Sequence, residues 1–148
     1  MSLLSFIFST KGGFHKTSGI LLLARLVFGL LLANHGLEKF MNFSAMSAQF
    51  PDPLSIGNEL SMGMAVFGEL VCSLAVVAGL FTRLAIIPII FTMIIAFFVV
   101  HGGSIAEGEL AFAYLVVYVL LFLAGPGKFS FDAFIESKLE AKENNGLR

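Results

Sequence analysis

Four long apolar stretches occupy most of this chain, and they constrain its fold more than any other feature. They cover residues 18–40, 60–81, 84–101 and 109–124. A membrane-spanning helix needs about 20 mainly apolar residues, because the hydrocarbon layer is about 30 Å thick and each helical residue rises about 1.5 Å. The last two stretches are short, but charged residues at their ends can reach the interface. We therefore expect an all-α transmembrane four-helix bundle that forms a single membrane domain over residues 1–148.

The composition excludes a water-soluble globule and argues against nucleic acid as a partner. Hydrophobic residues make up 57% of the chain and charged residues 13%, whereas a soluble domain carries about 25% charged residues. So much apolar side chain cannot be hidden in a small water-soluble core. The formal charge is −1, without the basic patch that nucleic acid requires. Cys72 is the single cysteine, so an internal disulfide and a paired-cysteine redox site are excluded.

Lysine and arginine residues outside the spans predict the orientation of the chain. Lys11 and Lys16 precede the first span, Arg83 lies between the second and third, and further basic residues follow the fourth. The connections 41–58 and 102–108 contain no lysine or arginine. Because cytoplasmic loops carry the excess of these residues, both termini should face the cytoplasm. We expect a multi-pass protein of the inner (cytoplasmic) membrane, with the lipid bilayer as its constant partner.

The segments outside the spans carry weaker signals. Met1–Thr10 is apolar but has no basic start, so it is interpreted as an interfacial anchor or an unstructured end, not as a cleaved signal peptide. After the helix-stopping sequence Gly125-Pro126-Gly127, apolar residues recur at helical spacing over about 130–142. This pattern predicts a short amphipathic cytoplasmic helix that lies along the membrane surface.

Ionisable residues and tyrosines inside the spans are the candidate functional residues. A charged group near the bilayer centre costs roughly 2.5 kcal/mol or more, so it normally faces the bundle interior and has a partner. Most of these residues fall in the predicted outer half of the bundle, where they would line a polar pocket. The candidates for ligand binding are Arg25, His35, Glu38, Lys39, Glu69, His101, Tyr114 and Tyr118.

The first span has a polar face. At about 100° per residue, Arg25, His35 and Lys39 lie within an arc of about 80° on one helix. Glu69, close to the middle of the second span, is the expected counter-charge for Arg25. Such a pair is equally a structural clamp that fixes helix register. Tyr114 and Tyr118 have a non-functional alternative too, as ordinary packing aromatics. The corresponding alternative for His101 is a solvated residue at the membrane boundary.

Several of these residues sit in motifs that resemble the DoxX family of small four-helix membrane proteins. The resemblance covers roughly residues 22–134 and rests on Arg25-Leu-Val-Phe-Gly-Leu, His35-Gly-Leu-Glu-Lys39, Glu69, Gly79-Leu-Phe-Thr-Arg83, His101-Gly-Gly and Gly125-Pro-Gly-Lys-Phe-Ser-Phe-Asp132. Some relatives are membrane subunits of thiosulfate:quinone oxidoreductase, and others accompany soluble redox or detoxification proteins. The resemblance therefore implies quinone-linked electron transfer with a soluble or membrane redox partner.

The leading hypothesis is a membrane subunit of an oxidoreductase that holds a quinone between its helices. His35, His101 and Tyr114 would supply donors to the quinone carbonyls, with Glu69 or Glu38 as proton relay. Haem bound by His35 and His101 is a less favoured alternative, and no metal site is predicted because no tight ligand spacing supports one. A non-enzymatic assembly, accessory or small-molecule transport protein is the other alternative. Homo-oligomerisation is compatible with either function.

Overall fold

The structure, a computed structural model, describes residues 14–146, and all the regular secondary structure in this part of the chain is helical. Four of its helices are long and apolar enough to cross a membrane: Thr17–Met41, Asn58–Ala78, Thr82–Val100 and Ile105–Ala124. These bounds agree with the predicted spans to within a few residues, so the prediction of an all-α membrane bundle is confirmed. The apolar segment Met1–Thr10 lies outside the described residues.

Two of the spans are each built from more than one helical segment. The first span is α2 (Phe14–Met41), followed by the short α3 (Phe43–Met46) and the 3-10 turn η1 (Ser47–Gln49). The second combines α4 (Asn58–Val66), the π-helical segment η2 (Phe67–Cys72) and α5 (Ser73–Ala78). The third combines α6 (Thr82–Ile94) with a second π-helical segment, η3 (Ile95–Val100), and the fourth is α7 (Ile105–Ala124).

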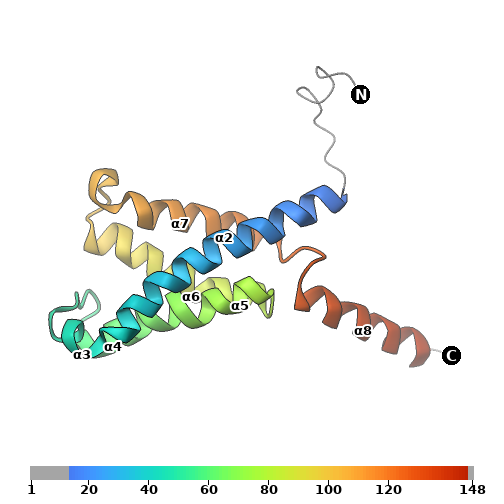
Figure 1. Cartoon of the computed structure of the whole chain (residues 1–148), viewed down its shortest axis with the longest axis horizontal. Helices are drawn as coiled ribbons and strands as arrows, with labels where there is room; N and C mark the ends of the chain where they lie inside the picture. The colour runs from blue at the N-terminus through green and yellow to red at the C-terminus, as the bar shows by residue number, and fades with distance from the viewer. Residues whose placement is uncertain (1–13, 147–148) are drawn as a thin grey trace, which may run out of the picture.

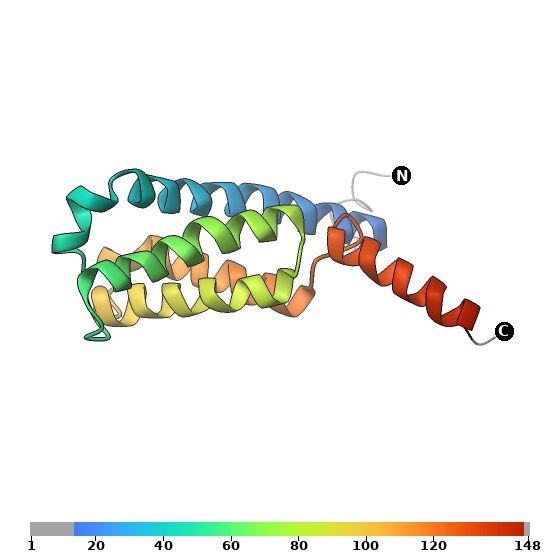
Figure 2. The ribbon, with the colours of Figure 1, turned by 90° about the horizontal axis from the view of Figure 1, so that it is seen from below.

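The connections gather at the two ends of the bundle (Figure 1). The 42–57 connection and the 101–104 turn lie at one end, which we call the loop end. The 79–81 turn, the start of α2 and the end of α7 lie at the other end, which we call the terminal end (Figures 1 and 2). The first span therefore runs from the terminal end to the loop end, and the second span runs back. This antiparallel course decides which side chains can meet.

The second span lies at the centre of the packing. Half of its most apolar window is buried inside the bundle, compared with 22–28% for the other three spans. Two glycines of α2 allow the close approach, because a Cβ atom at Gly29 would lie 2.5 Å from Val77 Cγ2, and one at Gly36 would lie 2.5 Å from the Leu70 backbone nitrogen. Contacts this short exclude any larger residue without a shift of the helices. Glycine in α2 therefore sets the distance between the first two spans.

The amphipathic C-terminal helix is α8 (Phe131–Gly146), close to the predicted range. Its apolar residues Phe131, Phe134 and Leu139 are each about 60% exposed. Figures 1 and 2 show α8 running outward from the terminal end, so its position along a membrane surface stays a prediction. The bonds that attach it to the bundle are made by its first turn and by the 125–130 linker.

Candidate functional site

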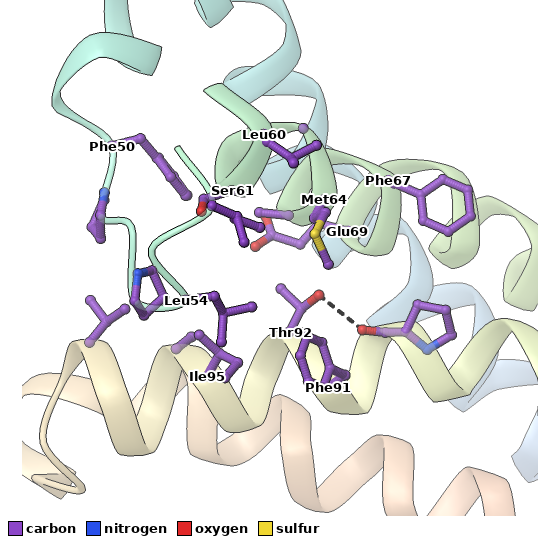
Figure 3. A pocket seen from close by; sticks show the side chains of 18 of the residues that line it. Phe50, Leu54, Leu60, Ser61, Met64, Phe67, Glu69, Phe91, Thr92 and Ile95 are labelled. Atoms are coloured by element: carbon purple, nitrogen blue, oxygen red, sulfur yellow. Dashed lines mark hydrogen bonds between the residues drawn. The ribbon is translucent and has the colours of Figure 1, made fainter. Parts of the chain in front are cut away.

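A pocket of about 830 Å³ lies between the second and third spans at the loop end (Figure 3). The 50–56 segment forms its roof, α4 and η2 form one wall, and α6 and η3 form the other. Most of the lining is apolar, in contrast to the polar pocket that the sequence predicted. The polar lining side chains are Lys39, Ser61, Glu69, Thr92 and His101.

Lys39 and Glu69 form an ion pair in this pocket, through Lys39 Nζ and Glu69 Oε2. The Glu69 side chain is 7% exposed and that of Lys39 24%. In a helix the Cα–Cβ bonds tilt toward the N-terminus. Lys39 on the first span therefore leans toward the terminal end, while Glu69 on the antiparallel second span leans toward the loop end. The two side chains approach each other because their helices run in opposite directions.

The same geometry explains why the expected pairing of Arg25 with Glu69 is wrong. Arg25 lies 14 residues before Lys39, or about 21 Å along the helix. Its side chain leans toward the terminal end, away from Glu69, whose side chain leans toward the loop end. Residue depth alone predicted the pair, but the side-chain directions separate the two charges and leave Lys39 as the partner of Glu69.

Arg25 instead joins three segments at the terminal end. It is 1% exposed, and its guanidinium donates to four backbone carbonyl oxygens. The distances are 2.9 Å to Val76, 3.0 Å to Val77, 2.7 Å to Pro126 and 2.9 Å to Phe129. The planar guanidinium with its five N–H donors can satisfy separate acceptors in this way, and a lysine could not reach all of them from one nitrogen. Arg25 thus clamps α2 to α5 and to the 125–130 linker, whereas the clamp that the sequence left open was the Arg25–Glu69 pair, which does not form.

Gly79 and Asp132 complete the attachment around Arg25. Gly79 has φ 72°, and a Cβ atom there would lie 2.5 Å from both Arg25 Nη2 and Ser130 Cβ. The Gly79 carbonyl oxygen accepts a hydrogen bond from the Asp132 backbone N–H at 2.9 Å. The Asp132 carboxylate in turn accepts from the backbone N–H groups of Phe81 and Thr82, at 2.7 and 2.8 Å. A carboxylate at this position caps the N-terminus of α6 and favours its dipole.

A second carboxylate, Asp52, organises the roof of the pocket. It accepts hydrogen bonds from the backbone N–H groups of Ile56 and Gly57, at 3.0 and 2.8 Å, and from the Ser61 hydroxyl at 2.7 Å. These bonds fasten the roof segment to the start of α4. Sequence reasoning did not single out Asp52, although aspartate is a typical turn residue whose carboxylate bonds nearby backbone N–H groups.

We expect this roof to loosen at low pH. The Ser61 hydroxyl and then the Gly57 N–H favour the ionised carboxylate and lower the pKa of Asp52. Because the pKa of Asp52 is lower in the folded than in the unfolded state, the ionised carboxylate stabilises the fold at pH values above the unfolded pKa of about 3.9. This stabilisation is lost as the pH falls through the lower pKa of the folded state. Hydrogen exchange over residues 52–61, corrected for intrinsic rates, should show more frequent opening at about pH 3 than near pH 7. Asp52→Asn should remove most of the difference; an unchanged pH dependence in that variant would contradict the assignment.

The remaining candidates lie in three places. His101 lines the pocket. His35, Tyr114 and Tyr118 form a column of rings within the bundle, with centroids 6.2 Å apart for His35–Tyr114 and 6.3 Å for Tyr114–Tyr118. The Tyr118 hydroxyl donates to the Phe28 carbonyl oxygen at 3.3 Å. Glu38 is exposed and accepts a hydrogen bond from the Asn34 side chain at 3.1 Å.

The structure therefore brings together Lys39, Glu69 and His101 from the predicted set, and places Arg25, His35, Glu38, Tyr114 and Tyr118 outside the pocket lining. Within residues 14–146, no three histidine, cysteine, aspartate or glutamate side chains lie close enough to hold a metal ion. Ser61 and Thr92 are pocket residues that sequence reasoning missed. The Thr92 hydroxyl donates to the Pro88 carbonyl oxygen at 2.9 Å, as Figure 3 shows.

Comparison with known proteins places these features in a family. The sequence model of the DoxX family matches residues 20–102, more than half of the chain. No match was found among curated proteins or among solved structures. The matched segment contains Arg25, the Lys39–Glu69 ion pair and Gly79, and the four apolar spans agree with the membrane character that the resemblance implied. The chain therefore belongs to the DoxX family of membrane proteins.

Proposed function

We propose that this protein is the membrane subunit of a redox system and binds a quinone in the pocket between its second and third spans. The observation that carries the proposal is the Lys39–Glu69 ion pair. Its two charged side chains are mostly buried and lie at the wall of an otherwise apolar pocket. Ligand sites in proteins are typically pockets of roughly 300–1,000 Å³ with apolar walls and a few convergent polar groups. The π-helical segment that contains Glu69 supports the same assignment, since such segments are frequent at functional sites.

The donors and acceptors of the pocket suit a quinone head group. The Lys39 ammonium can donate a hydrogen bond to a carbonyl oxygen, and Glu69 can hold or release a proton beside it. His101, at the loop end of the same pocket, can exchange protons with water. A bound quinone would supply the capacity to carry two electrons and two protons. The electrons would come from or pass to a soluble or membrane partner protein.

Haem fits less well than a quinone. His35 packs in the ring column beside Tyr114, whereas His101 lines the pocket. The two histidines that would act as axial ligands therefore belong to different parts of the bundle. The positions of the basic residues support a place in the cytoplasmic membrane with both termini on the cytoplasmic side. In that orientation the pocket roof faces outward.

A thermal-shift measurement tests the proposal. A quinone added to the purified full chain in mild detergent, at a hundred-fold excess over its Kd, should stabilise the fold by about 2.7 kcal/mol. For a chain of this size that corresponds to a rise in Tm of roughly 5–10 °C. Mass spectrometry of the detergent extract should also detect co-purified quinone. If no quinone co-purifies and none shifts the Tm, the proposal is wrong.

A further inference from the structure

The walls of the pocket differ in what they face. Lys39 of the first span and Glu69 of the second lie on its inner side. Five other lining residues are 42–57% exposed on the outside of the bundle: Leu60, Met64, Phe67, Ile87 and Phe91. We call these five the lipid flank. Because they belong to membrane-spanning helices, their exposed surfaces face acyl chains, so the pocket is open toward the bilayer.

The side of the pocket toward water is covered by apolar residues. The roof residues Phe50, Pro51, Pro53, Leu54 and Ile56 lie over the loop end of the pocket. Asp52 holds this segment in place through its bonds to Ile56, Gly57 and Ser61. The side chains of this roof offer no hydrogen bonds to a water-soluble ligand, whereas the open flank is continuous with the lipid.

The pocket is long as well as laterally open. Its lining on the third span extends from Val100, near the roof, down to Ile87. These positions are 13 residues apart, or roughly 20 Å along the helix, compared with about 30 Å for the whole hydrocarbon layer. A compact head group at Lys39 and Glu69 would leave the part of the groove beside Phe67, Ile87 and Phe91 empty. An elongated apolar tail would fill it.

We propose that the pocket takes a long-tailed, membrane-resident quinone, whose head lies at Lys39–Glu69 and whose tail leaves between the second and third spans along the lipid flank. This inference rests on the proposed function and specifies the class of quinone and its position. A transmembrane helix from a second copy is the competing occupant of such a groove. It is disfavoured because the roof closes the loop end and because a helix would cover the ion pair without polar groups to meet it.

The inference is tested by photolabelling the full chain in phosphatidylcholine nanodiscs. The probe is a quinone with a diazirine at the far end of an isoprenoid tail, and the labelled residues are identified by mass spectrometry. Label that is saturable, competed by unmodified quinone and located at Phe67, Ile87 or Phe91 supports the inference. Competed label on the roof or on α2 and α7 overturns the tail position while the proposed function stands. Label that unmodified quinone does not compete overturns both.

A matched pair of glycine variants strengthens the test. Gly63 lines the pocket and has open space where a Cβ atom would lie; Gly19, in the first span outside the pocket lining, has the same open space. Gly63→Trp should fill the loop end of the pocket and reduce competed labelling by about tenfold, equivalent to about 1.4 kcal/mol. Gly19→Trp should leave labelling unchanged. Equal labelling in the two variants would show that the labelled quinone does not occupy the pocket.

Discussion

Replacing Arg25 with alanine (R25A) should lower the unfolding free energy by about 4 kcal/mol, because it removes the guanidinium donor from the backbone carbonyls of Val76, Val77, Pro126 and Phe129. The Val76 carbonyl oxygen keeps a second donor, the Gly79 backbone N–H at 3.0 Å. R25K should recover only part of this loss, since one ammonium cannot reach all four acceptors on α5 and the 125–130 linker. Thermal unfolding in detergent measures the effect. Limited proteolysis within the 125–130 linker should show the local loosening directly.

Arg83→Ala is the matched control for R25A. Arg83 is an exposed arginine near the same end of the bundle, so this variant removes the same charge without removing the buried hydrogen bonds. Exposed surface substitutions usually change stability by about 0.5 kcal/mol or less. If R25A and Arg83→Ala destabilise the protein equally, Arg25 is not the clamp described above.

Breaking the Lys39–Glu69 pair is the second change with a large expected effect. Lys39→Met leaves the Glu69 carboxylate nearly buried and without a counter-charge, which should cost about 3–5 kcal/mol. Glu69→Gln should cost less, because the more exposed Lys39 ammonium can turn toward the interface. The double variant Lys39→Met/Glu69→Gln has no unpaired charge and should recover most of the stability. Urea or thermal unfolding of the four proteins gives the coupling between the two side chains.

The double variant also separates a binding role from a structural one. If the pair binds quinone, the double variant should fold normally and lose the quinone-induced rise in Tm. If the pair only fixes helix register, the double variant should fold and keep that rise. The second result would show that quinone binding does not depend on the Lys39–Glu69 pair. Arg25 shows that a buried charge in this bundle can be satisfied by backbone carbonyl oxygens.

The spans could be predicted from the sequence because length and hydropathy alone decide whether a helix crosses a membrane. The pairing of the charges could not. Residue depth favoured Arg25 as the partner of Glu69, and only the directions of the side chains on antiparallel helices select Lys39.

The dimensions of the pocket also could not be predicted from the sequence. Its volume depends on how far the second and third spans separate at the loop end and on how the roof folds over the gap. Those distances come from packing at positions such as Gly68, where a Cβ atom would lie 2.7 Å from Thr92 Oγ1. The apolar roof residues have no periodic pattern, so nothing in the sequence connects them with Glu69. The tyrosines were recognised as unusual, but periodicity could not distinguish a ring column in the core from a pocket wall.

The attachment at the terminal end sets a lower limit on the length of an independently folding DoxX unit. The family match ends at residue 102, yet two acceptors of Arg25 belong to Pro126 and Phe129, and the cap of α6 belongs to Asp132. A fragment trimmed to the matched region would therefore lose the fourth span, two acceptors of the Arg25 guanidinium and the carboxylate that caps α6. The shortest fragment that keeps these hydrogen bonds must extend at least to Asp132.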